Sequence, residues 1–203
     1  MNQIQTSPVQ ISRRSFMVGT SAMAGGGLAL GLNFIPSSEA HAQSTDTTTE
    51  VGVWVVVKPD DTCVVRVVRS EMGQGTRTGL AQLVAEELEC DWSKITTETP
   101  TPGQNLKRKR AWGDMSTAGS PGIRGSQDYV RRGGAVARMM LVQAAANEWN
   151  VPASELTAAN SIITHAASGR KTSYGKVAAA AAKLPVPDMK TVVLKDPRSW
   201  KIA

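Results

Sequence analysis

Two glycine-bearing loops constrain the fold most, because each follows an extended segment and leads directly into a helix. The first loop, 70–76, follows two β-branched runs at 51–57 and 62–68, which a Lys-Pro-Asp-Asp turn joins into a predicted hairpin. The second loop, 115–125, precedes a helix that a Val-Pro pair ends near residue 150. Strands and helices therefore interleave along the chain, and we predict an α+β fold.

Three helices and two further strands complete the predicted fold. Apolar residues recur at helical spacing over 76–90 and 126–150, and the segment 173–183 is rich in alanine. Short strands are expected at 95–98 and 161–165. The predicted architecture is thus a β-hairpin and short strands interleaved with three helices, with a loop over 99–113.

The first 42 residues predict an export signal. Arg13 and Arg14 lie in an Ile-Ser-Arg-Arg-Ser-Phe-Met pattern, which an uncharged stretch and an Ala-His-Ala cleavage signal at 40–42 follow. An uncleaved membrane anchor is the alternative, since the apolar run approaches the ~20 residues that span a bilayer. The three signals together favour a cleaved twin-arginine signal peptide over 1–42, followed by a Thr-rich linker at 43–50.

Two cysteines and two histidines exclude several kinds of site. A four-thiolate zinc site or an iron–sulfur cluster needs more thiolates than Cys63 and Cys90 supply. One disulfide between them is allowed after export, although the sequence gives no distance. Outside the leader, His165 is the only histidine, so a metal site or a Ser-His-acid triad would depend on it entirely. A structural role for His165 is the simpler interpretation.

The first loop has the composition of a ligand-binding turn. Gly73 and Gly75 permit positive φ and close approach of the backbone to a ligand. The N–H groups that open the following helix offer an anion site. The Gln74 amide both donates and accepts hydrogen bonds, which suits a pterin or a base.

The second loop repeats this pattern with Ala118, Gly119, Ser120 and Gly125, and Arg124 adds a positive charge. Two such helix starts that converge would suit a phosphorylated or dinucleotide cofactor. The alternative is that both are plain turns. Neither a Rossmann Gly-x-Gly-x-x-Gly pattern after a strand nor a Gly-Lys-Ser/Thr phosphate loop occurs.

The charged residues have structural interpretations beside functional ones. The basic run 107–110 is expected to be a solvated loop or a docking patch, because no aromatic residues interleave it and an exported protein rarely meets nucleic acid. Glu86, Glu87 and the arginines of the long helix are expected to face solvent. Glu71, beside the first loop, is the one carboxylate that we consider as a catalytic acid or base.

The segment from Arg69 to Thr76, Arg-Ser-Glu-Met-Gly-Gln-Gly-Thr, resembles the molybdopterin-binding subunit of molybdenum hydroxylases, the xanthine dehydrogenase and aldehyde oxidase family. The resemblance extends through Leu-Val-Ala-Glu-Glu-Leu at 83–88, Ile-Arg-Gly-Ser at 123–126 and Arg-Arg-Gly-Gly-Ala at 131–135. It is greatest for the branch with the isoquinoline 1-oxidoreductase beta subunit and the periplasmic aldehyde dehydrogenase large subunit. The chain departs from that branch at Ala118, where glycine is usual, and at Gln127, where an aromatic residue is common.

The resemblance implies a partial molybdopterin-binding domain of the aldehyde oxidase type over 51–184, and a tail at 185–203 that leads to a missing large domain. It also implies part of a site for molybdopterin cytosine dinucleotide, formed by Gly73, Gln74, Gly75, Thr76, Ala118, Gly119, Ser120 and Arg124. The family oxidises aldehydes or N-heterocycles by water-derived hydroxylation. Its catalytic glutamate lies beyond residue 203, so we assign no catalytic and no metal-ligating residue in this chain.

The resemblance also implies partner subunits. In the family a [2Fe–2S] cluster on a separate subunit takes the electrons, which agrees with the two cysteines here, and a cytochrome c subunit is a further expected partner. Twin-arginine export predicts a periplasmic location, with attachment to the inner membrane through these partners. The chain is then the N-terminal cofactor-binding portion of a molybdenum hydroxylase and is not catalytic alone. The alternatives are an exported non-catalytic binding module that reuses the fold, and an independent enzyme that uses Glu71.

Overall fold

The computed structural model describes residues 49–201. The predicted signal peptide at 1–42 and most of the linker at 43–50 lie outside the described residues. The described residues fall within one compact unit, and none of their helices is long and apolar enough to cross a membrane.

A four-stranded sheet carries the first loop. It consists of β1 (Thr49–Glu50), β2 (Val55–Val57), β3 (Cys63–Arg66) and β4 (Ile95–Glu98), in that order across the sheet. The β2–β3 hairpin confirms the predicted one, and β1 adds to it antiparallel. β4 runs parallel to β3, so the chain crosses over between these two strands. The first loop follows β3 and opens the helix of this crossover.

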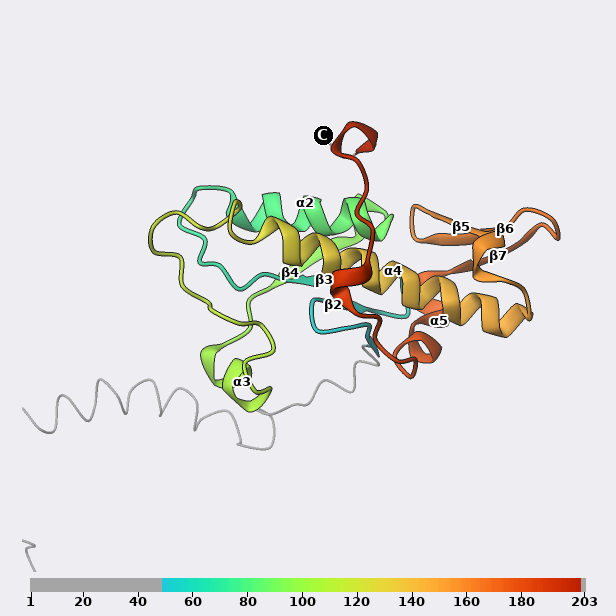
Figure 1. The fold of residues 1–203 in the computed structure, drawn as a ribbon, viewed down its shortest axis with the longest axis horizontal. Helices are drawn as coiled ribbons and strands as arrows, with labels where there is room; N and C mark the ends of the chain where they lie inside the picture. The colour runs from blue at the N-terminus through green and yellow to red at the C-terminus, as the bar shows by residue number, and fades with distance from the viewer. Residues whose placement is uncertain (1–48, 202–203) are drawn as a thin grey trace, which may run out of the picture. The chain divides into compact units, whose positions relative to one another are not determined.

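Two long helices cover one face of this sheet (Figure 1). They are α2 (Thr76–Leu88) and α4 (Gln127–Trp149), which confirm two of the three predicted helices. The helices approach closely at Gly134, where an added Cβ would lie 2.6 Å from the Val84 carbonyl oxygen. Both helices begin at the same end of the molecule, so the loops that precede them are neighbours.

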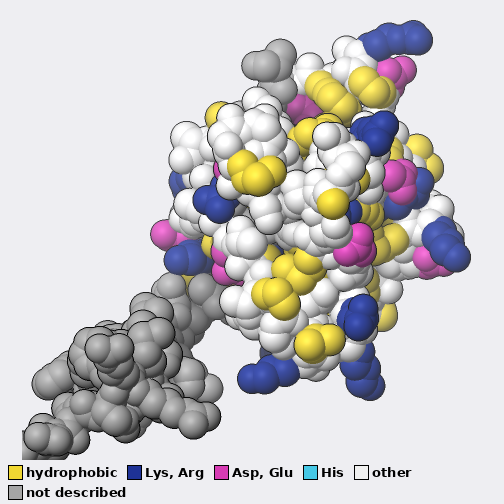
Figure 2. Space-filling view, turned by 90° about the vertical axis from the view of Figure 1, so that its left-hand side faces the viewer, with side chains coloured by type: hydrophobic (Ala, Val, Ile, Leu, Met, Phe, Trp, Pro, Cys, Tyr) yellow, Lys and Arg dark blue, Asp and Glu magenta, His cyan; other side chains and the backbone are white. Residues whose placement is uncertain are grey.

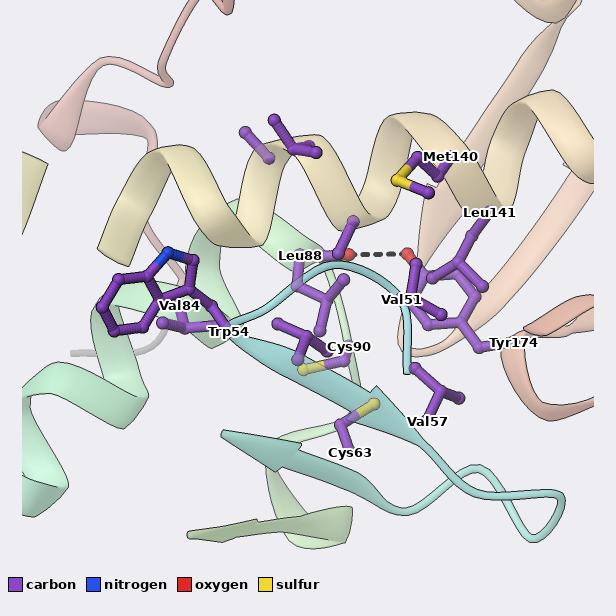
Figure 3. Close-up of a cluster of buried hydrophobic side chains, with 14 of the residues drawn as sticks. Val51, Trp54, Val57, Cys63, Val84, Leu88, Cys90, Met140, Leu141 and Tyr174 are labelled. Carbon is purple, nitrogen blue, oxygen red and sulfur yellow. Dashed lines mark hydrogen bonds between the residues drawn. The ribbon is translucent and has the colours of Figure 1, made fainter. Parts of the chain in front are cut away.

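A second sheet and a third helix follow α4. The strands β5 (Leu156–Ala159), β6 (Ile162–His165) and β7 (Arg170–Ser173) form an antiparallel meander, of which only β6 was expected. The Ala-rich helix is present as α5 (Tyr174–Ala181). Its first residue is fully buried, and the Tyr174 hydroxyl donates to the Leu88 carbonyl oxygen at 2.6 Å (Figure 3). This contact ties the meander to the end of α2.

One short helix was missed. The segment 99–113, which was expected to be a loop, contains α3 (Pro102–Lys107). Thr101 caps it by accepting from the Gln104 N–H, and the Gln104 side chain accepts from the Thr101 N–H in return, which is a capping box. Single 3₁₀ turns occupy Trp92–Lys94, Ala153–Glu155, Met189–Thr191 and Pro197–Ser199.

The expectation that Glu86 and Glu87 face solvent was wrong, because the C-terminal segment 185–201 covers them. Glu87 is fully buried and accepts from the Arg131 guanidinium at 2.7 Å and from the Lys195 N–H at 3.2 Å. Glu86 pairs with the Lys195 ammonium at 3.1 Å and accepts from the Lys201 N–H at 3.0 Å. The arginines of α4 are likewise partly covered rather than solvated.

Candidate functional site

The structure brings the two glycine-bearing loops together at the starts of α2 and α4. A hollow of about 660 Å³ lies between them and is lined by Met72, Gln74 and Thr76 from the first loop and by Thr117, Ser120 and Arg124 from the second. We call this hollow the loop cleft. The loops touch at its floor, where a Cβ added to Gly122 would lie 2.9 Å from the Thr76 hydroxyl.

Four of the eight predicted site residues line the loop cleft: Gln74, Thr76, Ser120 and Arg124. The other four, Gly73, Gly75, Ala118 and Gly119, belong to the same loops. The three glycines among them have positive φ, at 95°, 79° and 76° respectively. A side chain at these three positions would be strained. Figure 2 shows the end of the molecule where the loops lie; hydrophobic side chains there are interspersed with charged ones.

The predicted anion site at the start of α2 is filled by the chain itself. One carboxylate oxygen of Glu71 accepts from the N–H groups of Gly73 at 2.8 Å and Gly75 at 3.1 Å, and the other accepts from Arg77 at 2.9 Å. These hydrogen bonds, led by those from Arg77 and Gly75, hold the pKa of the Glu71 carboxyl below its ordinary value. Glu71 therefore stays ionised and caps the helix, and it has neither the raised pKa nor the free oxygens of a proton-transferring group.

The Gln74 amide is also engaged within the first loop. Its oxygen accepts from the Met72 N–H at 2.6 Å, and its nitrogen donates to the Ser70 carbonyl oxygen at 2.8 Å. The amide thus spans the turn while one side of it lines the loop cleft. The side chains of Glu71 and Gln74 therefore both stabilise the conformation of the first loop.

Arg69 joins the two loops, a role that the sequence analysis did not assign. Its guanidinium is buried; it donates to the Ser126 hydroxyl at 2.9 Å and to the Ser116 carbonyl oxygen. The Ser70 N–H adds a further link to the Thr117 hydroxyl at 3.0 Å. A basic residue directly after a buried strand and directly before a glycine loop is the signal that points to such a role.

Arg124 carries the accessible positive charge of the loop cleft. Among the described residues its guanidinium donates to the Gly119 carbonyl oxygen at 3.2 Å, and no carboxylate pairs with it. The basic run behaves differently: Arg108 binds both oxygens of Glu50 at 2.6 and 2.9 Å and lies over the Trp112 ring. In the part of the chain that the structure describes, the other three basic residues of the run form no ion pair.

The remaining candidates are structural. Cys63 and Cys90 are both buried and free, and their side chains lie in the core between the sheet and α2 (Figure 3). A hydrogen bond with the Cys63 thiol, and then burial, raise the pKa of the Cys90 thiol. His165 is buried, with one ring nitrogen 2.7 Å from the Ser168 hydroxyl and the other 2.9 Å from the Glu155 carboxylate. Within residues 49–201, no three His, Cys, Asp or Glu side chains gather as metal ligands would.

His165 places a serine, a histidine and a carboxylate in one hydrogen-bonded row. Ser168 lies only three residues along the chain, in the turn between β6 and β7, and Glu155 lies just before β5. The row therefore joins neighbouring segments of one small meander. We interpret these hydrogen bonds as a structural contact that stabilises the meander, in keeping with the structural role expected for His165.

Comparisons with known proteins identify the family of the chain. A family model described as a molybdopterin cofactor-binding domain matches residues 11–201. The chain is 33% identical over 175 residues to the isoquinoline 1-oxidoreductase subunit beta of Brevundimonas diminuta, covering 84% of this chain and 22% of that protein. It is 31% identical over 172 residues to the membrane-bound aldehyde dehydrogenase (pyrroloquinoline-quinone) of Gluconacetobacter polyoxogenes, covering 83% and 21%. The chain thus spans about a fifth of the length of these relatives.

Solved structures with a similar chain path include quinoline 2-oxidoreductase from Pseudomonas putida 86, with a TM-score of 0.46 at 17% identity over 66% of this chain and 17% of that one. They also include the Cu,Mo-CO dehydrogenase, with a TM-score of 0.47 at 16% identity over 79% and 23%. The match of the family model over nearly the whole chain is the finding that decides the assignment. This chain belongs to the molybdopterin cofactor-binding domain family.

Proposed function

We propose that the loop cleft holds part of molybdopterin cytosine dinucleotide, and that the chain is the cofactor-binding part of a molybdenum hydroxylase. The observation that carries this proposal is the meeting of the two glycine-bearing loops at one hollow in a chain of this family. The resemblance implies that the same two loops contact the cofactor, which supports the proposal.

The donors at the loop cleft fit such a group. Hydroxyls of Thr117 and Ser120 and the guanidinium of Arg124 suit phosphate oxygens, while the Gln74 amide offers one donor and one acceptor to a pterin edge. When bound, the cofactor would supply the redox-active molybdenum centre, for which the described residues provide no ligand cluster.

The chain alone is proposed to bind rather than to catalyse. It spans about a fifth of the length of the two relatives named above, one of which is called a subunit beta. We therefore propose that the complete enzyme oxidises an aldehyde or an N-heterocycle, and that the catalytic glutamate lies outside this chain. A [2Fe–2S] subunit and a cytochrome c subunit are the proposed electron acceptors, and the signal peptide predicted over 1–42 supports a proposed periplasmic location.

Metal and nucleotide content test the proposal. The full chain is purified after expression with and without a [2Fe–2S] subunit, and molybdenum and the cytidine monophosphate released by acid are measured per chain. Equal amounts of both are expected. Gln74→Ala should lower both several-fold, because it removes the amide that lines the cleft and braces the loop.

Gln143→Ala is the matched control, since this exposed amide of α4 bonds only to Asn147 among the described residues. Its metal content should equal that of the wild type. Full molybdenum content in Gln74→Ala, or none in the wild type under either condition, would overturn the proposal. Release of a guanine nucleotide would still support a molybdopterin dinucleotide, but it would overturn the proposal that the nucleotide is cytosine.

A further inference from the structure

The two walls of the loop cleft differ in charge, and the difference is built into the chain. The first wall is formed by the first loop, within which the Glu71 carboxylate takes the N–H groups of Gly73, Gly75 and Arg77. These are the amides that a helix start following a glycine loop would otherwise present to a phosphate. The first wall is therefore already occupied by a negative group.

A phosphate would have to displace Glu71 to use these amides. The carboxylate is tethered two residues before Gly73, so it competes as an intramolecular ligand at high effective concentration. A second anion beside the ionised carboxylate would also meet like-charge repulsion. Both effects close the start of α2 to phosphate at neutral pH.

The second wall is positive. Arg124 lines the loop cleft and donates only to one backbone carbonyl among the described residues, so further donors of its guanidinium remain for a ligand. Behind this wall, the buried Arg69 guanidinium contacts a hydroxyl and a carbonyl oxygen, and no carboxylate in the described part of the chain touches it. Among the described residues, neither of these two arginines forms an ion pair with a carboxylate.

We infer that the loop cleft has a fixed polarity: Glu71 closes the first wall to phosphate, and Arg124 on the second wall receives the anionic end of the ligand. Gln74 and Thr76 then face an uncharged, hydrogen-bonding part of that ligand. The identity of the ligand rests on the proposed function, but the polarity rests on the hydrogen bonds of these two loops. Glu71 is accordingly a positioning residue and Arg124 a binding residue.

Inorganic pyrophosphate is a direct probe of this polarity. It is titrated into the ¹⁵N-labelled full chain at neutral pH, and the backbone amide signals are followed. The amides of Gly119, Ser120 and 122–124 should shift, while those of Gly73, Gly75 and Arg77 should not. Arg124→Gln should weaken the binding about tenfold or more, as expected for loss of a charge-assisted hydrogen bond.

Arg77→Gln is the matched control, because it removes an exposed cation whose residue is not among those that line the loop cleft, and it should leave binding unchanged. Glu71→Ala supplies the converse test: with the carboxylate gone, pyrophosphate should now shift the amides of Gly73, Gly75 and Arg77. A far-ultraviolet spectrum like that of the wild type shows that each variant is folded, and Glu71→Gln, which keeps the side-chain length, is the second variant if Glu71→Ala does not fold.

Shifts at Gly73, Gly75 and Arg77 in the wild type, equal binding by Arg124→Gln, or no binding by the wild type would each overturn the inference. The molybdenum measurement is independent of this probe. A chain that carries molybdenum but binds pyrophosphate at the first wall refutes the polarity alone. A chain with Arg124-dependent binding and no molybdenum under any condition refutes the proposed function alone.

Discussion

The Glu71 carboxylate determines what the first loop can offer to a ligand. From the sequence, the Gly-Gln-Gly turn before a helix indicates open amides. The structure instead gives three of those amides to a side chain that begins two residues upstream. The glycines keep the positive φ that their type predicts, but they serve an internal cap as well as an external surface. The Gly-Gln-Gly motif therefore predicted the conformation of the loop, but it did not predict which group accepts hydrogen bonds from the loop N–H groups.

The pH dependence of stability should report this cap. Because the folded chain lowers the pKa of Glu71 from its ordinary value of 4.5, the carboxylate stabilises the fold above that pH, and the contribution is lost as pH falls through the lowered pKa. Glu71→Gln should thus be less stable than the wild type at pH 7, with a difference that shrinks towards pH 3. Urea unfolding of both proteins at the two pH values measures this, and a difference independent of pH would contradict it.

Loop conformation was predictable where backbone geometry demands a residue type. Gly73, Gly75 and Gly119 do adopt positive φ, which favours glycine. Arg69 and Glu71 received no such roles, because long side chains can point in many directions and spacing does not choose among them. Their roles appear only once the second loop and the start of α2 are in place.

At the scale of elements, periodicity predicted the long helices, whereas some of the short elements were missed. The helices α2 and α4 have 13 and 23 residues, so apolar residues recur over several turns in each. The strands β5 and β7 have only four residues each, and α3 has six. Such lengths give too few repeats to reveal a period. For α3 the capping box Thr-Pro-Gly-Gln was present in the sequence and would have indicated the helix start.

Packing of α2 on α4 depends on the missing side chain at Gly134. An alanine Cβ there would lie 2.6 Å from the Val84 carbonyl oxygen, so Gly134→Ala must separate the helices or bend one of them. We expect a loss of about 1–3 kcal/mol in the free energy of unfolding, the usual effect of overpacking. Gly103→Ala in α3 is the control, since its nearest neighbour would be 3.9 Å away, and it should cost nothing measurable. Thermal unfolding compares them; equal midpoints would refute the close approach.

At the scale of the whole molecule, buried charge holds the C-terminal segment in place. Arg131 of α4 contacts Glu87 of α2, the Lys195 carbonyl oxygen at 2.6 Å and the ring of Trp200 at 5.0 Å. The sequence shows these residues as ordinary surface charges because their partners lie more than 40 residues apart. Only in the folded chain do Glu86 and Glu87 of α2 contact the segment that follows α5 and hold it in place.

Breaking the ion pair between Glu87 and Arg131 should release the C-terminal segment and destabilise the whole chain. Glu87→Gln keeps the shape of the side chain but leaves Arg131 and its neighbours without a buried countercharge, which typically costs about 3–5 kcal/mol. Asp128→Asn is the control, because it breaks an exposed ion pair with Arg132 and should change stability by less than about 0.5 kcal/mol. Urea unfolding measures both variants, and limited proteolysis should cleave Glu87→Gln first within 185–201. If Glu87→Gln were as stable as Asp128→Asn and equally resistant there, the buried ion pair would not be what holds the C-terminal segment, and apolar packing around Val192 would have to account for it.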